Sequence, residues 1–166
     1  MGRKSIRENK NEYQLAREAA GLTRAEAAEL MEYISESRIE KIESEKSEPH
    51  PDEIVAMAHA YKRPGLCNYF CSTKCPLGQN SVPQVEDKDL SQIVLELLAT
   101  LNNLNKERDR IIEISADGVI SADEVPDFAR IKKQLTQISM TVDSLQLWID
   151  NTIASGSVDS ENLKEL

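Results

Sequence analysis

The chain has 166 residues, of which 40% are hydrophobic, 30% are charged and 4% are aromatic, with six glycines. This composition is typical of a soluble globular protein and favours helix over sheet. No apolar run approaches the roughly 20 residues that a membrane-spanning helix needs, and the polar start of the chain lacks the apolar core of a signal peptide. We therefore expect a cytoplasmic protein without a membrane partner.

The net charge of −9 excludes a surface that is basic throughout, and with it strong nonspecific binding to nucleic acid. The charge is uneven along the chain. Residues 1–63 hold eleven Lys and Arg against thirteen Asp and Glu, a net of −2, which leaves −7 for residues 64–166. Any surface that binds DNA must therefore be local and lie in the first part of the chain.

Turn signals divide residues 1–74, which we interpret as one domain, into about five short helices. The helix-forming stretch over residues 11–20 ends at Gly21. Thr23, with Glu26 three residues later, forms a capping box for the next helix. These two helices are expected to meet across a tight corner.

Two further boundaries follow in the same domain. Ser35 is a suitable N-cap for the stretch "ESRIEKIE". Pro49 and Pro51 then separate that helix from one over residues 52–61.

Residues 75–89 contain two prolines, one glycine and few apolar residues, and we interpret them as a linker. Beyond the linker, seam residues recur at steps of four and three in two sets. These are Leu90, Val94, Leu97, Leu101, Leu104, Arg108 and Ile111, then Phe128, Ile131, Leu135, Ile138, Val142, Leu145 and Ile149. The pattern predicts an antiparallel pair of long helices over residues 90–154, followed by a flexible tail over 155–166. The expected fold class is therefore all-α.

More apolar residues lie beside the two seams than one partner helix can cover: Ile93, Leu98, Ile112 and Trp148. A second hairpin would cover them, which predicts a homodimer through residues 90–154 with a four-helix bundle. Packing of the hairpin against the N-terminal domain would hide the same surface and is the alternative.

The stretch "GLTRAEAAEL", the stretch "SRIEKIESEK" and the stretch "EPHPDEIVAMAHAY" together resemble the phage-lambda-repressor-like, or XRE-type, helix-turn-helix family over about residues 9–66. One departure is visible, because "MEYIS" holds one more residue than the usual turn between the second and third helices. The resemblance implies a domain whose third helix projects from the surface and binds double-stranded DNA. The small core that sets the helix angle is expected to consist of Ala27, Leu30, Ile34, Ile39 and Ile42.

The resemblance also implies roles for individual residues. Arg17 and Glu43 occupy the places of a structural ion pair between the first and third helices. Glu36, Ser37 and Lys41 take the positions that read bases in the major groove. The candidates for contacts with the DNA backbone are Arg24, Arg38 and Lys46, with Arg3, Lys4, Arg7 and Lys10 as a basic arm ahead of the first helix.

Two other clusters have a chemical and a structural interpretation. Cys67, Cys71 and Cys75 lie at steps of four and could hold zinc or part of an iron-sulfur cluster, but reduced cysteines packed under the domain are the favoured interpretation. Residues 113–124 can be aligned with a calcium loop, with oxygen ligands Glu113, Ser115, Asp117 and Glu124 and with Gly118 at the turn. The favoured interpretation is a helix stop at Gly118 and a capping box of Ser121 with Glu124.

No phosphate loop and no nucleophile beside a base is visible, so neither enzyme activity nor a cofactor is expected. The sequence predicts a sequence-specific transcriptional regulator, in the first place a repressor, that acts as a dimer. The alternatives are an adaptor that keeps the helix-turn-helix fold but binds protein, and a cysteine-dependent metal or redox sensor.

Overall fold

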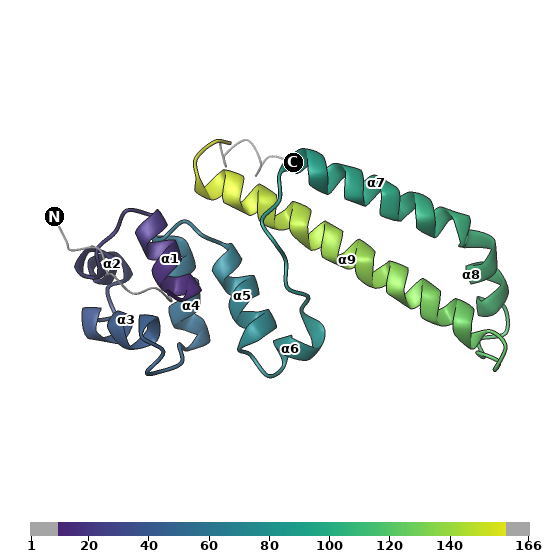
Figure 1. The fold of residues 1–166 in the computed structure, drawn as a ribbon, viewed down its shortest axis with the longest axis horizontal. Coiled ribbons are helices and arrows are strands. Elements are labelled where there is room, and N and C mark those ends of the chain that lie inside the picture. Colours follow the sequence, from purple (N-terminus) through teal and green to yellow (C-terminus); the bar gives the residue numbers. More distant parts are fainter. Residues whose placement is uncertain (1–9, 159–166) are drawn as a thin grey trace. The chain divides into compact units, whose positions relative to one another are not determined.

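A computed structural model describes residues 10–158, and within that range the regular structure is entirely helical (Figure 1). The helices are α1 Glu12–Ala19, α2 Arg24–Met31, α3 Glu36–Glu43, α4 Pro51–Ala60, α5 Gly65–Thr73, α6 Gly78–Ser81, α7 Leu90–Lys106, α8 Arg108–Ser115 and α9 Val125–Ala154. The predicted all-α class, with short helices first and two long helices in contact later, is confirmed. None of these helices combines the length and the apolar character that crossing a membrane requires.

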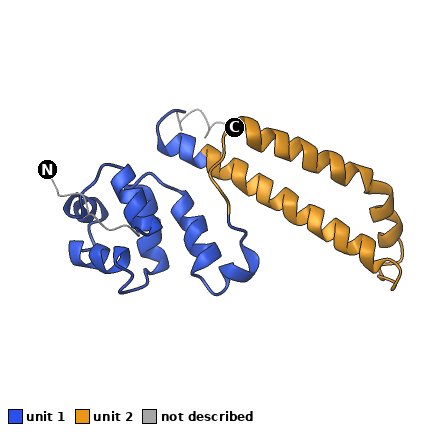
Figure 2. Ribbon diagram, viewed as in Figure 1, with its two compact units in different colours: residues 1–84, 150–166 blue, residues 85–149 orange. Residues whose placement is uncertain are grey.

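The chain forms two compact units (Figure 2). One contains residues 1–84 and 150–166, and the other contains residues 85–149. The first unit therefore includes the helices α1 to α6, and the second includes α7, α8 and most of α9.

Side chains at the starts of the first three helices satisfy backbone N–H groups that have no partner within the helix. Asn11 accepts from the N–H of Gln14 before α1, and its own side chain donates to the carbonyl of Ile42 at 2.9 Å. The capping box of Thr23 and Glu26 begins α2, as predicted. Ser35 caps α3 by accepting from the N–H of Arg38 at 3.3 Å, and this prediction is also confirmed.

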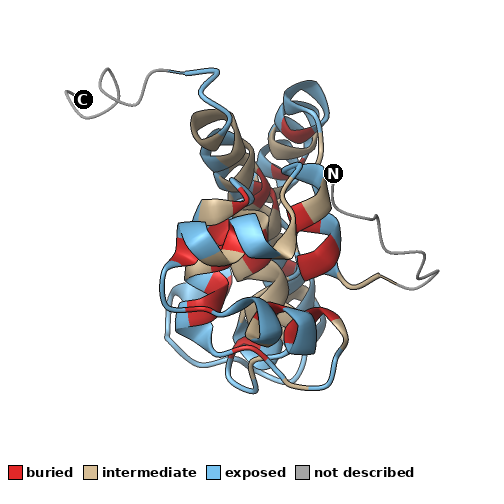
Figure 3. Cartoon of the chain, turned by 90° about the vertical axis from the view of Figure 1, so that its left-hand side faces the viewer, coloured by how far each residue is buried: buried red, intermediate tan, exposed pale blue. Residues whose placement is uncertain are grey.

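A single apolar cluster holds the short helices together, and buried and exposed residues alternate around each of them (Figure 3). Its buried members are Tyr13, Ala16, Ala27, Met31, Ile34, Ile39, Ile42, Ile54, Met57, Ala58, Tyr61 and Leu66. Four of the five predicted core residues are among them, but Leu30 is 59% exposed. Met31, one residue later, is 4% exposed and takes the inward position, because the spacing of four from Ala27 keeps it on the same helix face.

The turn between α2 and α3 carries a backbone conformation that only a minority of non-glycine residues adopt. Glu32 ends α2 with φ of 56° and ψ of −50°. Tyr33 follows, and its hydroxyl donates to the carbonyl of Asp52 at 3.0 Å, which attaches the turn to the start of α4. The extra residue noted in the sequence is therefore accommodated in a turn that is held in place.

The stretch interpreted as a linker contains one short helix, α6, and the chain is closely packed there. A Cβ atom on Gly78 would lie 2.1 Å from the carbonyl oxygen of Cys71. Only glycine fits at this position without a shift of the backbone.

The second unit is a helical hairpin in which α7 forms the first arm, α8 turns from its end towards the connection, and α9 returns alongside α7 (Figure 1). The first arm is broken at Glu107, between α7 and α8, where a continuous helix was expected. Ion pairs join the two arms near the connection: Arg110 contacts Asp127 at 2.6 Å and Arg130 contacts Glu107 at 2.9 Å.

The predicted seams of this hairpin are partly wrong. On α7 the inward side is formed by Ile93, Leu97, Thr100 and Leu104, whereas Leu90, Val94 and Leu101 are 38%, 37% and 45% exposed. On α9 the residues Phe128, Leu135, Val142 and Ile149 stay 46%, 52%, 45% and 41% exposed. The apolar band on each helix is wider than one helix can cover, and periodicity alone does not decide which edge of the band faces the partner arm.

The connection of the two arms follows the structural interpretation of residues 113–124. Gly118 has φ of 71°, which favours glycine. The carboxylate of Glu124 accepts from the backbone N–H of Ser121 at 3.0 Å and from its hydroxyl at 2.6 Å. These bonds form a turn directly before α9, which begins at Val125.

Candidate nucleic-acid interface

Helix α3 presents one polar face because its other face is anchored in the core. Ile39 and Ile42 are 0% and 1% exposed. With the 3.6-residue period of a helix, their burial turns a different set of side chains outward. The outward residues are Glu36, Ser37, Glu40 and Lys41. The three predicted base-reading residues are thus all exposed, on the first turn and one turn later.

The carboxylate of Glu43, at the end of α3, is 3% exposed and binds two arginines. Arg17 of α1 donates to it through Nε at 2.5 Å and through a terminal nitrogen at 3.0 Å. Arg24, the first residue of α2, donates through Nε at 2.8 Å. The expected pair of Arg17 with Glu43 is thus present, and three charge-assisted hydrogen bonds connect α1, α2 and α3 at one point.

This cluster fixes the angle at which α3 leaves the domain. Burial acts to lower the pKa of Arg17, but the hydrogen bonds to Glu43, the charge of Glu43 and smaller effects of Tyr61 and Glu18 together outweigh burial and raise the pKa. Arg17 also donates to the carbonyl of Leu22 at 2.6 Å, in the corner between α1 and α2. The negative charge of Glu43 is therefore compensated inside the domain and does not face a DNA backbone.

The side chain of Arg24 binds Glu43 at one end and is exposed at the other, which the sequence did not indicate. Its Nε atom binds Glu43, and its side chain is about one-third exposed, at 31%. Within the described part of the chain its terminal nitrogens have no hydrogen-bond partner. They remain free to bind a phosphate at the N-terminus of α2, where backbone N–H groups and the helix dipole also favour an anion.

Arg38, which the sequence suggested for contacts with DNA phosphates, makes most of its hydrogen bonds within the domain. It makes two hydrogen bonds to the carboxylate of Glu53, at 2.6 and 2.7 Å, and two more to the Ser47 hydroxyl and the Glu48 carbonyl, at 2.5 and 2.8 Å. These bonds use four of its five N–H groups. Arg38 therefore attaches α3 to α4, and since one N–H group is left over, its contact with the DNA backbone stays a prediction.

Sequence reasoning missed Glu53, the residue of α4 that pairs with Arg38. It is 7% exposed, and its carboxylate also accepts from the backbone N–H of His50 at 2.7 Å. The signal was available, because Glu53 stands at the third position of a helix that begins at Pro51, where a capping carboxylate is common.

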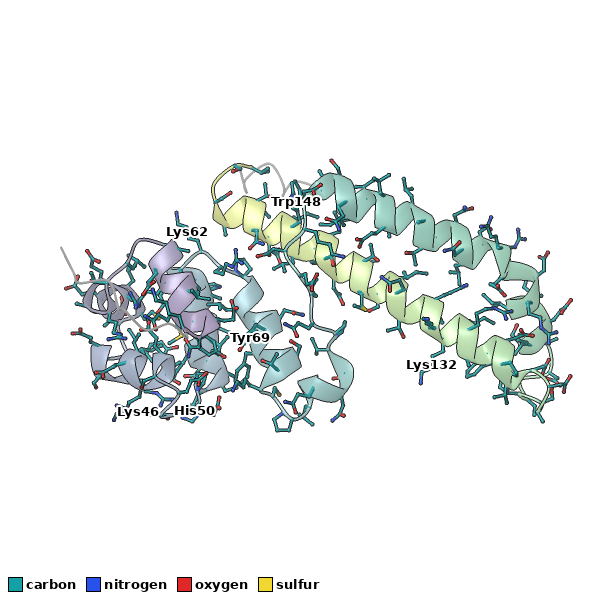
Figure 4. The ribbon with its side chains drawn as sticks, viewed as in Figure 1. Lys46, His50, Lys62, Tyr69, Lys132 and Trp148 are labelled. Carbon is teal, nitrogen blue, oxygen red and sulfur yellow. The ribbon has the colours of Figure 1, made fainter. Side chains whose placement is uncertain are left out.

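Lys46 and Lys41 are both exposed near one end of α3. The backbone N–H of Lys46 donates to the carbonyl of Lys41 at 2.9 Å, which closes the turn after α3. Figure 4 shows Lys46 at the outer edge of this turn, beside α3. Two exposed lysines therefore lie at the C-terminal end of α3.

The surroundings of α3 are nevertheless acidic. The exposed glutamates in α3 and its flanking turns are Glu32, Glu36, Glu40, Glu45 and Glu48. Against them stand Lys41, Lys46 and Arg24, whose side chain is about one-third exposed. Lys10, from the predicted basic arm, pairs with Glu18 at 2.6 Å. The other residues of the arm, Arg3, Lys4 and Arg7, lie outside the described residues.

The two candidate metal clusters are not assembled. Between residues 10 and 158, no group of three or more His, Cys, Asp or Glu is arranged to hold a metal ion. The three cysteines Cys67, Cys71 and Cys75 are free thiols, and burial raises the pKa of Cys67. Glu113 pairs with Arg110 at 2.9 Å, and Asp117 accepts from the N–H of Val119 at 3.0 Å.

Comparison with known families agrees with this geometry. The family model HTH_3, described as helix-turn-helix, matches residues 14–65. These residues are therefore a helix-turn-helix domain, the class of DNA-binding domain that the packing of α1 to α4 and the exposed α3 define.

Within that class the domain is of the XRE, or lambda-repressor-like, type, as the sequence resemblance implied. No catalytic family was identified with it. No curated protein and no solved structure gives a significant match to the chain.

Proposed function

We propose that the protein is a sequence-specific transcriptional regulator that acts in the cytoplasm as a dimer and represses the genes whose operators it binds. The observation that carries this proposal is the geometry of α3. Ile39 and Ile42 hold one face in the core, and the cluster around Glu43 fixes the end of the helix. A short helix that is held so firmly and still exposes a polar face is suited to enter a major groove.

The exposed side chains of α3 have the chemistry for reading base edges. Lys41 can donate to the acceptors of guanine, and Ser37 can donate or accept. Ser37 lies 3.1 Å, oxygen to oxygen, from the hydroxyl of the N-cap Ser35, which holds it at the start of the helix. Glu36 can accept from the N4 amino group of cytosine, so an acidic residue here selects bases and need not prevent binding.

Contacts with phosphates would come from two places on either side of α3. Arg24 offers its free terminal nitrogens at the start of α2, and Lys46 offers its amino group after α3. Such contacts position the helix without reading sequence. Since exposed glutamates lie between them, the affinity of one domain should be modest and strongly dependent on salt.

Modest affinity per domain makes a dimer the working form. Two domains that read half-sites about 34 Å apart gain affinity because the second binding event becomes intramolecular. The apolar residues left exposed on the hairpin, among them Leu135 and Val142, support residues 90–154 as the dimerisation part.

The test is selection from random duplex DNA with the full chain, followed by fluorescence anisotropy on the recovered sequence. The expected result is enrichment of a two-part motif, with affinity that falls steeply between about 50 and 200 mM salt. Recovery of no motif, or equal weak binding to all duplexes, would contradict sequence-specific recognition.

A second candidate function is an adaptor that uses the same fold to bind a protein. The observation that favours it is the excess of exposed glutamates around α3, combined with the internal pairing of Arg38 and of the Nε atom of Arg24. An adaptor would give no enriched DNA motif, and charge-reversal of Glu36 and Glu40 to lysine would give general DNA binding in place of specific binding.

A further inference from the structure

The hairpin of the second unit leaves apolar side chains exposed on both of its arms. We define the apolar face as the eight residues Val94, Leu98, Leu101 and Ile112 from α7 and α8, and Phe128, Leu135, Val142 and Ile149 from α9. Their exposed fractions run from 37% to 59%.

These eight residues lie on one side of the hairpin. Leu101 directly follows the buried Thr100 on α7, and Val142 directly follows the buried Thr141 on α9. Each of the other six also directly follows a buried or half-buried residue. The pairs, with the less exposed residue first, are Ile93–Val94, Leu97–Leu98, Ile111–Ile112, Asp127–Phe128, Gln134–Leu135 and Trp148–Ile149. One residue is a rotation of about 100° around the helix axis. Because the two arms run in opposite directions, the same rotation on each brings both sets to the same side of the hairpin.

The apolar face is too large for the free surface of a monomer. From the exposed fractions, the eight side chains leave roughly 700 Å² exposed, at or above the largest patch on a typical soluble monomer and close to the roughly 800 Å² that each partner buries in a standard interface. A surface of this size and composition fits an apolar partner surface of similar shape.

A second copy of the hairpin has that surface, and a two-fold axis can bring the two apolar faces together in two ways. If the axis runs along the helices, both connections between α8 and α9 lie at the same end and α9 packs on α7 of the partner subunit. If the axis runs across the helices, the connections lie at opposite ends and α9 packs on α9 of the partner subunit. All neighbouring helices are antiparallel in both bundles.

The charge of the hairpin favours the second bundle. The open end, residues 85–98 and 139–149, holds five acidic residues and one lysine, a net of −4. The connected end, residues 99–138, holds seven acidic residues and six basic ones, a net of −1. If both connections lie at the same end, the open ends of the two subunits, each with a net charge of −4, lie beside each other. In the opposite orientation each open end lies beside a connected end with a net charge of −1, which lowers the repulsion.

The spacing on α9 favours the same arrangement. Its four exposed apolar residues are seven apart, so the row matches itself when it is reversed. Phe128 then lies opposite Ile149 of the partner subunit, Leu135 opposite Val142 of the partner subunit, and the axis passes near Ser139. Lys132, which extends from the side of α9 away from α7 (Figure 4), comes within about one helical turn of Asp143 of the partner subunit.

We propose that two copies of the chain form a four-helix bundle through this apolar face, with α9 antiparallel to α9 of the partner subunit and the two connections at opposite ends. This inference rests on the proposed function for its dimer and adds the surface, the axis and the orientation.

The orientation is tested by disulfide cross-linking in the full chain with Cys67, Cys71 and Cys75 changed to serine. Ser139 is exposed beside the row on α9 and lies next to the proposed axis. Oxidation should join Ser139→Cys to itself, and should join a mixture of Phe128→Cys and Ile149→Cys chains but neither of them alone. If Ser139→Cys stays uncoupled while mixed Leu101→Cys and Leu135→Cys chains are joined, the bundle has the other orientation and the proposal is wrong.

Light scattering on the chain with its three native cysteines tests whether the apolar face forms the dimer interface. The native chain should be a dimer, and Leu135→Glu should weaken dimerisation by roughly 100-fold or more, because two carboxylates would be buried in an apolar interface. Asn103→Glu is the control: Asn103 is exposed and lies on the side of α7 opposite the apolar face, about 200° around the helix axis from Leu101, so this variant should remain a dimer.

These results separate the bundle from the DNA-binding function. A native chain that is monomeric at tens of micromolar but still enriches a DNA motif overturns the bundle and leaves the regulator intact. A chain that cross-links as predicted but enriches no motif supports the bundle and overturns the regulator.

Discussion

At the scale of single residues, the buried Glu43 connects separate helices of the domain. Its buried carboxylate binds Arg17 of α1 and Arg24 of α2, so three helices depend on one charged group. A buried charge that loses its partners costs far more than an exposed pair contributes. The cluster therefore acts on stability and on the placement of α3 together.

We predict that Glu43→Ala lowers the free energy of unfolding by about 3–5 kcal/mol, because it leaves Arg17 buried without its anionic partner. Urea denaturation followed by circular dichroism measures this change. Glu40→Ala is the control, because Glu40 is exposed on the same helix and its loss should stay within about 0.5 kcal/mol. Equal effects of the two substitutions would show that the cluster contributes little.

The pair of Arg38 and Glu53 gives a prediction about pH. The hydrogen bonds from Arg38 lower the pKa of Glu53 below its ordinary value of 4.5 and outweigh the opposing effect of burial. A carboxylate whose folded pKa is lowered stabilises the fold above its unfolded pKa, and this contribution is lost as the pH falls through the folded value. Glu53→Gln should therefore be less stable than the native chain by about 1–2 kcal/mol at pH 6, and the difference should shrink below pH 4.5.

The measurement is urea denaturation of both chains at several pH values. A difference between native chain and Glu53→Gln that stays constant from pH 6 to pH 3 would mean that the pair does not stabilise the fold through its charge.

Single residues also set the limit of what the sequence could predict. The caps at Thr23 and Ser35 were predictable, because they depend on neighbours within four residues. The additional partner of Glu43 and the partner of Arg38 were not, since each joins helices that are separated by turns whose geometry no short pattern specifies. Arg38 looked like a free surface cation for that reason.

At the scale of elements, α3 packs one face into the core and leaves the other face exposed to solvent. This separation predicts that substitutions on the outer face change DNA recognition without changing stability. Lys41 and Lys46 provide the contrast, because both are exposed lysines and only the first lies in α3.

We predict that Lys41→Ala changes the base preference at one position of each half-site and costs about 1–3 kcal/mol there. Lys46→Ala should weaken all sequences about equally and reduce the slope of log affinity against log salt by roughly one per site. Anisotropy on a panel of single-base variants measures both. A uniform loss for Lys41→Ala would remove it from the base-reading residues. Arg24 is less suitable for this test, since its substitution also disturbs Glu43.

The long helices show a different limit. Their existence and antiparallel direction were predictable from periodicity, whereas the inward residues were not, because the apolar band of α9 covers both an inward edge at Ile131 and an outward edge at Leu135. The width of this apolar band made the predicted inward residues partly wrong, and the same width predicts a partner for the apolar face.

At the scale of the whole molecule, recognition by two domains requires that they belong to one assembly. We predict that Leu135→Glu binds a single half-site as well as the native chain does but loses at least roughly tenfold in affinity for the complete two-part site. Asn103→Glu should bind both like the native chain. Anisotropy on the half-site and on the complete site measures the two affinities, and an unchanged affinity of Leu135→Glu for the complete site would contradict a role of the hairpin in DNA binding.

The charge of the whole chain is consistent with the proposed roles, in which the N-terminal domain binds DNA and the hairpin joins two chains. With a net charge of −9, the chain has no general attraction to phosphates, and the hairpin contributes no basic excess. If the protein is the proposed regulator, its affinity for DNA would therefore come from shape, base contacts and the joining of two domains.

The most direct test of the role of α3 is an NMR titration of the ¹⁵N-labelled full chain with the duplex recovered by selection. We predict that the largest shift changes occur at the backbone amides of residues 35–41, with smaller changes at Arg24 and Lys46 and none on the hairpin. Changes that leave residues 35–41 untouched and appear elsewhere on the chain would contradict the entry of α3 into the major groove.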